Sequence, residues 1–336
     1  MRVIADAPCR VDLAGGTLDI WPLYLYHPGS VTVNFAISLH ARCSIRIRGD
    51  RRVIVRARDL GSEERFASLE ALRAARRYRL PLHAHVAAEL APESGLEIET
   101  ASDAPAGAGL AGSSTLIIAL ASALAKLGGR RFPKARLRET AQNIEARIIR
   151  VPTGSQDYYP ALYGGVNAIE LGAEAVRRSA IRVPLAELNQ RFVLAYTGEP
   201  RNSGINNWEV MKAHIDGDRR VQRNFDEIAE IARGMRRALE RCDWEEAGRL
   251  LREEWRHRRR NAPGITTPLI NSLVERARRA GAMGAKVCGA GGGGCVVLLC
   301  DPAAQARVRE AAQAAGAQVL PVRAVSGGVR VRAVPQ

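Results

Sequence analysis

Alternation of hydrophobic and polar positions predicts β-strands in much of the first hundred residues. Residues 63–91 instead space their apolar positions as a helix does. The first part of the chain is therefore expected to be mainly β-strands with one helical stretch. The Val- and Ile-rich alternating segments are residues 2–13, 31–39, 43–49, 52–58 and 95–100.

Two helices are predicted next, over residues 114–127 and 134–149, followed by a strand at 164–171. Residues 110–127 are the most membrane-like part of the chain, but glycine and hydroxyl residues interrupt them. A buried helix therefore explains this stretch better than a membrane span.

The second half of the chain alternates strands and helices without the regular rhythm of a doubly wound sheet. We therefore expect an α+β fold, with domains at residues 1–172 and 173–336. Residues 172–186 are mixed in character, which favours a domain boundary or a hairpin there. The elements predicted beyond it are strands at 191–198 and 295–300, helical segments at 206–240, 243–260, 266–281 and 302–315, and a terminal strand pair.

Composition excludes disorder as the main state, because 46% of the 336 residues are hydrophobic and 25% are charged. The formal charge is +15, and only four of the 50 basic residues are lysine. Such a charge fits either a solvated arginine-rich surface or attraction to anions such as nucleotides, sugar phosphates or nucleic acid. The six cysteines lack metal-ligand spacing, and residues 1–16 lack the continuous apolar core that is typical of a secretory signal. We expect reduced, mostly buried thiols in a soluble cytoplasmic protein.

A glycine-rich loop at residues 105–112 is the strongest local signal, because it lies between a predicted strand and a predicted helix. Glycines let backbone N–H groups approach an anion, and the helix N-terminus adds a positive dipole end. The P-loop is excluded, since no Gly-Lys-Ser/Thr follows. The dinucleotide fingerprint is spelled by Gly107, Gly109 and Gly112, but no acidic residue lies between Asp103 and Glu139 to bind the ribose. Phosphate binding remains the interpretation.

Three ordered motifs resemble those of the GHMP kinases, the family of galactokinase, homoserine kinase and mevalonate kinase. Residues 111–115 (AGSST) align with the second half of the family's phosphate loop. Residues 7–19 resemble its N-terminal substrate segment, and residues 286–294 (KVCGAGGGG) resemble its C-terminal glycine run. The resemblance implies a two-domain fold, with an N-terminal domain like that of a ribosomal protein and a ferredoxin-like C-terminal domain.

Within the family, residues 154–158 and 162–165 are most similar to the heptose 7-phosphate kinase and fucokinase type of sugar-1-kinase. Leu18 and Tyr158 depart from the residues usual there, and Trp21, Tyr24 and Tyr26 place aromatic side chains near the expected sugar site.

The resemblance also implies residue roles. Asp157 is the candidate base and Arg10 its neighbouring cation, while Ser114 and Glu145 are candidate ligands for Mg²⁺. Substrate contacts are expected from Gly15, Gly16, Asp19, Gly291 and Gly292. The ATP phosphates are expected at Pro105, Gly107, Gly109, Leu110, Ala111, Gly112, Ser113, Ser114 and Thr115.

The resemblance implies transfer of the γ-phosphoryl group of MgATP to a sugar hydroxyl, the anomeric hydroxyl of a heptose 7-phosphate or a related sugar. A mevalonate- or homoserine-type acceptor is the alternative. An RNA-binding module is a more distant one, but the densest basic run, residues 256–260, has a single tryptophan beside it. We expect a monomer or homodimer with a small-molecule substrate and no nucleic-acid or membrane partner.

Overall fold

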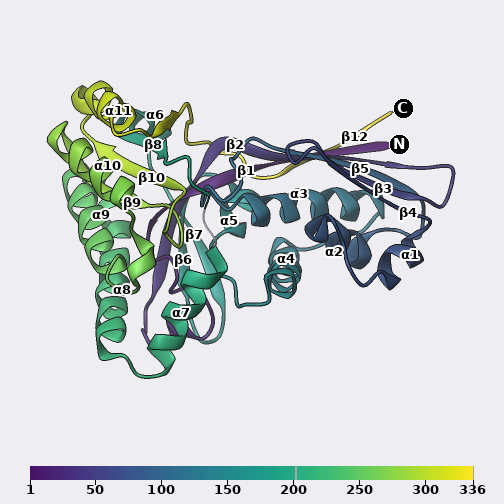
Figure 1. Cartoon of the computed structure of the whole chain (residues 1–336), viewed down its shortest axis with the longest axis horizontal. Helices are drawn as coiled ribbons and strands as arrows, with labels where there is room; N and C mark the ends of the chain where they lie inside the picture. Colours follow the sequence, from purple (N-terminus) through teal and green to yellow (C-terminus); the bar gives the residue numbers. More distant parts are fainter. Residues whose placement is uncertain (201–202, 336) are drawn as a thin grey trace.

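A computed structural model of the chain describes residues 1–200 and 203–335, and only the backbone of residues 203–206. It contains two β-sheets with helices packed on them, so the α+β prediction is confirmed (Figure 1). The larger sheet has eight strands, in the order β12-β1-β2-β5-β3-β4, with β6 between β2 and β7. Its strands are β1 (Arg2–Ala14), β2 (Val31–Ile47), β3 (Val53–Ala57), β4 (Ser62–Phe66), β5 (Leu96–Ser102), β6 (Val166–Leu171), β7 (Val176–Ile181) and β12 (Arg330–Val334).

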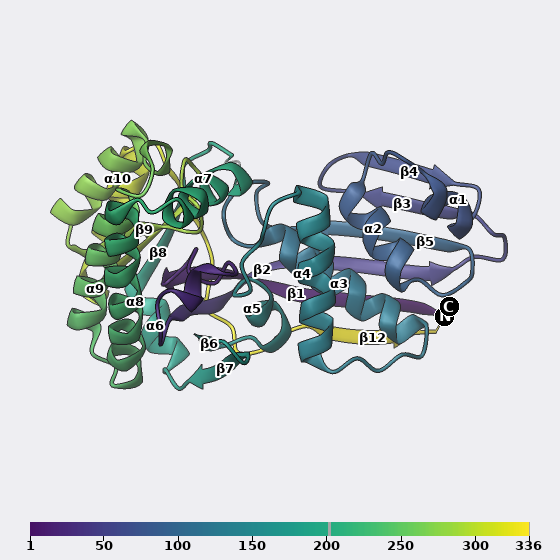
Figure 2. The same ribbon diagram turned by 90° about the horizontal axis from the view of Figure 1, so that it is seen from below.

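Five helices accompany the larger sheet, and α3 packs directly on β1 and β2. Figure 2 shows α2, α3 and α4 on one face of the sheet. These helices are α1 (Leu69–Ala74), α2 (Pro81–Leu90), α3 (Gly112–Leu127), α4 (Lys134–Ile149) and α5 (Tyr158–Tyr163).

The smaller sheet has the order β11-β8-β10-β9, and all of its pairings are antiparallel. Its strands are β8 (Phe192–Tyr196), β9 (Ala282–Val287), β10 (Cys295–Cys300) and β11 (Gln318–Leu320). The accompanying helices are α6 (Leu185–Arg191), α7 (Ser203–Ile215), α8 (Arg219–Glu240), α9 (Trp244–Arg258), α10 (Pro268–Arg279) and α11 (Gln305–Ala314). Three short 3-10 turns complete the description, at Leu23–Leu25, Pro263–Ile265 and Pro302–Ala304.

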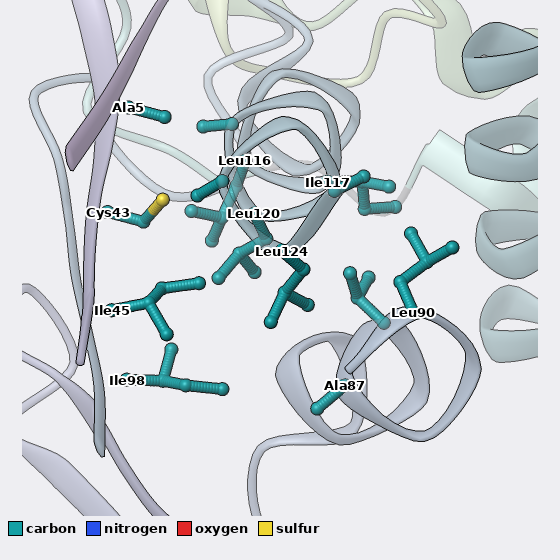
Figure 3. Packing of buried hydrophobic residues seen from close by; sticks show 14 of the residues in the cluster. Ala5, Cys43, Ile45, Ala87, Leu90, Ile98, Leu116, Ile117, Leu120 and Leu124 are labelled. Atoms are coloured by element: carbon teal, nitrogen blue, oxygen red, sulfur yellow. The ribbon is translucent and has the colours of Figure 1, made fainter. Parts of the chain in front are cut away.

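Helix α3 is the centre of the larger core, and almost all of its residues are buried. Its leucines recur every fourth residue and therefore share one face of the helix. Figure 3 shows that this face meets strand residues on one side and α2 on the other. The membrane-like stretch is thus a core helix, as predicted, and none of the described helices is long and apolar enough to span a bilayer. The labelled core side chains include Ile45, Ile98, Leu116, Leu120, Leu124 and Leu90.

The structure differs from the predicted elements in five places. The segment 206–240 is two helices, α7 and α8, because the chain turns at Gly217, with a φ of 90°, and Asp218 caps α8. Residues 31–39 and 43–49 form one continuous strand, because a register shift at Pro8 and Cys9 of β1 absorbs the irregularity. The segment 63–91 is not wholly helical, since β4 pairs with β3 before α1 and α2 begin. Strand β9 was not predicted. Strands β11 and β12 are not a pair, because β11 joins β8 and β12 joins β1.

Strands β7 and β12 come from beyond residue 172, yet both belong to the larger sheet. The chain therefore leaves this sheet after β7, builds the smaller sheet and its helices, and returns as β12 beside β1 (Figure 1). The predicted division between residues 172 and 173 stays a prediction.

Candidate active site

The glycine-rich loop leads from β5 into α3 with three residues in the left-handed region of backbone space. Gly107 and Gly109 have φ values of 69° and 78°, and Ala111, the N-cap of α3, has 61°. No side chain caps this helix. The first N–H groups of α3 are therefore left for another acceptor, which suits an anion such as phosphate.

The C-terminal glycine run lies directly against this loop. The Cys295 N–H donates to the Ala108 carbonyl at 2.8 Å. A Cβ atom on Gly294, whose φ is +80°, would lie 2.7 Å from that same carbonyl oxygen. Glycine at 294 thus allows two motifs far apart in the sequence to meet.

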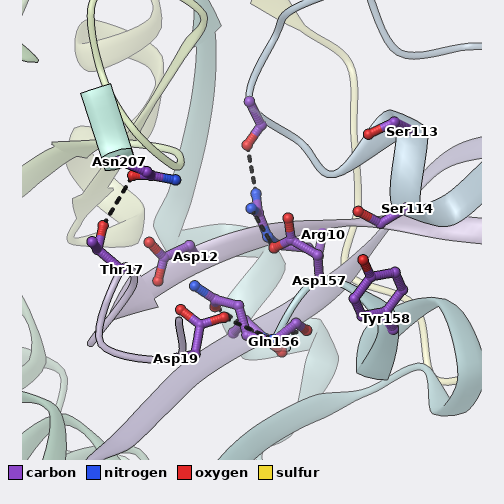
Figure 4. A network of polar contacts seen from close by, with 12 residues as sticks. Arg10, Asp12, Thr17, Asp19, Ser113, Ser114, Gln156, Asp157, Tyr158 and Asn207 are labelled. Carbon is purple, nitrogen blue, oxygen red and sulfur yellow. Dashed lines mark hydrogen bonds and ion pairs between the residues drawn. The ribbon is translucent and has the colours of Figure 1, made fainter. Parts of the chain in front are cut away.

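Arg10 joins the glycine-rich loop to Asp157, as Figure 4 shows. Its guanidinium donates to one Asp157 carboxylate oxygen, through Nε at 3.0 Å and Nη2 at 2.7 Å. Its Nη1 donates to the Gly109 carbonyl at 2.5 Å. Arg10 is 2% exposed, so this charge is buried and paired. The arrangement holds the Asp157 carboxylate beside the loop.

Glu145 of α4 accepts three hydroxyl hydrogen bonds, from Ser113 at 2.5 Å, Ser114 at 2.7 Å and Tyr158 at 2.6 Å. Burial raises the pKa of Glu145 above its ordinary value. The oxygen atoms available as metal ligands belong to a carboxylate and to hydroxyl groups, and they lie next to the glycine-rich loop. This arrangement suits Mg²⁺ bound through one carboxylate and the phosphates of a ligand. No group of three or more His, Cys, Asp or Glu residues that could hold a metal ion occurs among the described residues, at this site or elsewhere.

Asp19 is held in place by the loop that precedes Asp157. The Gln156 N–H donates to Asp19 Oδ2 at 2.9 Å. A Cβ atom on Gly154 would lie 2.1 Å from that oxygen, so glycine is required there. Burial, and then the negative charge of Asp157, raise the pKa of Asp19 to about 7.

These groups surround a cleft of about 370 Å³. Of the residues singled out in the sequence, those lining it are Arg10, Gly16, Asp19, Pro105, Gly107, Gly109, Leu110, Ala111, Gly112, Ser113, Glu145 and Asp157.

Five of the predicted site residues do not line the cleft. Ser114 and Thr115 are buried at the start of α3, and Gly15 lies against the Val31 carbonyl. Gly291 and Gly292 lie against Ile265 rather than along the cleft, whereas Gly289 and Ala290, just before them, line it.

Several residues at the site carried no assignment from the sequence. Tyr158 was noted only as a departure from a motif, yet its hydroxyl binds Glu145. Asp12 and Lys286 belonged to motifs but had no role, and Glu254 was not noticed. Arg258 belongs to the basic run 256–260 and is nevertheless 3% exposed. The sequence did offer a signal for the pairing of Glu254 with Arg258, because the two residues are four apart on one helix and therefore lie on the same face.

A loop suited to an anion, oxygens suited to a divalent cation and an aspartate paired with arginine fit the requirements of phosphoryl transfer. Family models agree with this class. The model described as "GHMP kinases N terminal domain" matches residues 71–165, and the one described as "GHMP kinases C terminal" matches residues 235–318. The chain belongs to the GHMP kinase family.

Known relatives include sugar kinases and mevalonate kinases. The chain is 27% identical to D-glycero-alpha-D-manno-heptose 7-phosphate kinase of Campylobacter jejuni, over 88% of this chain and 89% of that one. It is 24% identical to L-fucokinase/L-fucose-1-P guanylyltransferase of Bacteroides fragilis, where it spans 35% of the longer protein. It is also 25% identical to mevalonate kinase of Thermococcus sibiricus over the full length of both.

Solved structures share the whole fold. A D-glycero-D-manno-heptose 1-phosphate kinase from Bacteroides thetaiotaomicron superimposes with a TM-score of 0.80 at 24% identity, over 99% of this chain and 100% of that one. Galactokinase of Lactococcus lactis, complexed with galactose, gives 0.80 at 20% identity, over 98% and 95%. At these identities the likeness establishes the fold alone.

Proposed function

We propose that this kinase transfers the γ-phosphoryl group of MgATP to a sugar hydroxyl, the anomeric hydroxyl of a heptose 7-phosphate or a related sugar. The observation that carries the proposal is Arg10, which bonds both the Gly109 carbonyl and the Asp157 carboxylate. One buried cation thereby links an anion-binding loop to a group able to orient a hydroxyl.

Residues 105–115 form what we call the nucleotide side of the cleft. Their N–H groups and the start of α3 are suited to the phosphates of ATP. The apolar side chains of Leu60, Leu116 and Ile149, which line the same cleft, are suited to the base. Glu145 and Ser114 would hold Mg²⁺, which when bound neutralises negative charge on the transferring phosphates.

Residues 16–19 and 154–157 form what we call the acceptor side. The Asp157 carboxylate accepts or orients the proton of the attacking hydroxyl, and the ion pair with Arg10 holds that carboxylate in place. Asp19 accepts hydrogen bonds from other hydroxyl groups of the sugar. The cleft is closed from the smaller sheet by Gly289 and Ala290, while Gly291 and Gly292 support them.

Similarity to the heptose 7-phosphate kinase and the fucokinase supports a sugar acceptor. Full-length similarity to a mevalonate kinase supports the alternative, a non-sugar acceptor such as mevalonate or homoserine. In either case we propose a small-molecule kinase of the cytoplasm, monomeric or homodimeric, without a nucleic-acid or membrane partner.

The test is ADP release from ATP with Mg²⁺ and a panel of sugars, sugar phosphates, mevalonate and homoserine. We expect turnover above background with a heptose phosphate or a related sugar, at the anomeric position by NMR of the product. An Asp157→Asn chain assayed in parallel removes the contribution of contaminating ATPases. Turnover with mevalonate or homoserine alone would favour the alternative, and background rates across the panel would refute both.

A further inference from the structure

Four charged side chains lie buried beneath the loop that carries Asp19. Their exposed fractions are 3% for Arg258 and 0% for the other three. They come from three elements that are distant in the sequence, and we call them the buried charge cluster. Its members are Asp12 on β1, Glu254 and Arg258 on α9, and Lys286 on β9.

The cluster is neutral and closely paired. Lys286 Nζ lies 2.6 Å from Asp12 Oδ2 and 3.5 Å from Glu254 Oε1. Arg258 donates to the same Glu254 oxygen through Nε at 2.9 Å and Nη2 at 2.5 Å. Two cations therefore balance two carboxylates, as a buried site requires.

The guanidinium of Arg258 also reaches out of the cluster to the acceptor side of the cleft. Its Nη2 donates to the Gly16 carbonyl at 2.7 Å, and its Nη1 donates to the Thr17 hydroxyl at 3.2 Å. The Thr17 hydroxyl in turn donates to Asn207 of α7 at 3.3 Å. The loop is thus fixed between two helices of the C-terminal half.

Gly16 explains how the loop can approach so closely. A Cβ atom at this position would lie 2.6 Å from Asp12 Oδ2 and 3.2 Å from Arg258 Nη2. The next backbone bond, from the Ile20 N–H to the Thr17 carbonyl at 3.1 Å, closes a turn that contains Asp19. The position of Gly16 and Thr17 therefore sets the position of Asp19.

Stability alone does not account for such a cluster, because well-packed apolar side chains stabilise a core as well as buried ion pairs or better. Apolar side chains would not, however, bond the carbonyl of Gly16 and the hydroxyl of Thr17. We propose that Arg258, held by Glu254 and the Asp12–Lys286 pair, is a positioning residue. It fixes the conformation of the loop 16–19 in which Asp19 can bind the acceptor. The claim that the loop then binds the acceptor rests on the proposed function, whereas the claim that Arg258 fixes the conformation of the loop does not.

The first test compares Arg258→Lys with Arg256→Lys. Lysine at 258 keeps the charge beside Glu254 but loses the donors to Gly16 and Thr17. Arg256 is the matched control, because it pairs with Glu253 at 2.7 Å on the same helix without reaching the loop. For Arg258→Lys we expect the KM for the acceptor to rise roughly ten- to a hundredfold, the range for hydrogen bonds from a charged group. The KM for MgATP should stay within about twofold, and Arg256→Lys should resemble the parent enzyme.

The second test follows the loop itself and needs no substrate. Amide hydrogen exchange at Leu18 and Ile20, whose N–H groups bond the Gly15 and Thr17 carbonyls, should accelerate about tenfold or more in Arg258→Lys and not in Arg256→Lys. Thr17→Ala provides a variant that leaves the buried cluster intact, should Arg258→Lys not fold. It should change exchange and acceptor KM in the same direction by a smaller factor.

The outcomes separate the two proposals. Unchanged amide exchange at Leu18 and Ile20 in a folded Arg258→Lys chain, or in Thr17→Ala, overturns the claim that Arg258 fixes the conformation of the loop. Faster exchange with an unchanged acceptor KM overturns its role in acceptor binding. A parent enzyme that phosphorylates no acceptor of the panel refutes the proposed function, while exchange still decides whether Arg258 sets the loop.

Discussion

The two sides of the cleft are built differently. The nucleotide side is one run of eleven consecutive residues, 105–115, that offers mainly backbone N–H groups. The acceptor side depends on side chains from β1, α7, α9 and β9, which lie far apart along the chain. The nucleotide side can therefore be recognised in one short segment of the sequence, whereas the acceptor side can be recognised only in the complete fold.

The largest expected effect comes from Asp157→Asn, which keeps the shape of the acceptor side but removes the charge beside Arg10. Turnover should fall by about 10²–10⁴, the range for a positioned acid–base group. The affinity for MgATP should change little, and added Mg²⁺ should not restore the rate. Steady-state kinetics measures the turnover, and calorimetry measures the affinity for MgATP.

Asp50→Asn is the control for this prediction, because Asp50 also pairs with arginine but lies outside the cleft. A loss of ATP affinity equal to the loss of rate would contradict the separation of the two sides.

The next effect tests the nucleotide side. Gly109→Val places a side chain at a position with a φ of 78°, in the loop suited to phosphate. ATP affinity should weaken about a hundredfold, as expected when hydrogen bonds to a charged group are lost, with acceptor binding nearly intact. Gly129→Val carries the same strain, at a φ of 66°, beyond the other end of α3 and should bind ATP normally. Unchanged ATP affinity in a folded Gly109→Val chain would move the phosphate site elsewhere.

Glu145→Gln should have an intermediate effect that magnesium partly reverses. The amide keeps hydrogen-bonding capacity toward Ser113 and Ser114 but loses the negative charge of a metal ligand. Apparent Mg²⁺ affinity should fall about tenfold, within the range for changes around a metal site. Turnover measured against Mg²⁺ concentration checks this, with the exposed Glu139→Gln on the same helix as control. Equal magnesium rescue of Glu145→Gln and Asp157→Asn would show that the two roles are wrongly divided.

The smallest effect concerns the pH dependence of stability. Burial and the charge of Asp157 raise the pKa of Asp19 from 3.8 to about 7. Between these values the folded chain binds a proton that the unfolded chain does not, so this group makes stability fall as pH rises. Asp19→Asn lacks that loss, and its Tm relative to the parent should increase by up to about 10 °C between pH 4 and pH 8, since one pKa unit corresponds to about 1.4 kcal/mol and each kcal/mol to about 2–4 °C. A Tm difference that stays constant with pH would argue against a protonated Asp19.

The sequence predicted what depends on local pattern. The motifs around Gly109, Asp157 and Glu145 were found because each lies in a short segment, and the structure brings them to one cleft. Helix α3 was likewise predicted by its apolar length. The pairing of β12 with β1 was not predicted, because the alternating pattern of five residues does not specify which strand they pair with.

Arg258 shows the same limit at the level of a single side chain. Its neighbours Arg256, Arg259 and Arg260 make the segment look like a solvated basic surface. Its burial became evident only when Glu254, Gly16 and Thr17 were brought together by the fold. Similarly, the sequence showed Tyr158 only as a departure from a family motif, whereas in the structure its hydroxyl donates a hydrogen bond to Glu145.

The route of the chain between the two sheets limits how the molecule can move. The C-terminal helices and the smaller sheet are attached to the larger sheet at two crossings, one after β7 and one before β12. Arg258 and Asn207 add non-covalent contacts to these two crossings, because both bond the loop 16–19 at the cleft. Any widening of the cleft must therefore bend both crossings together and break these contacts.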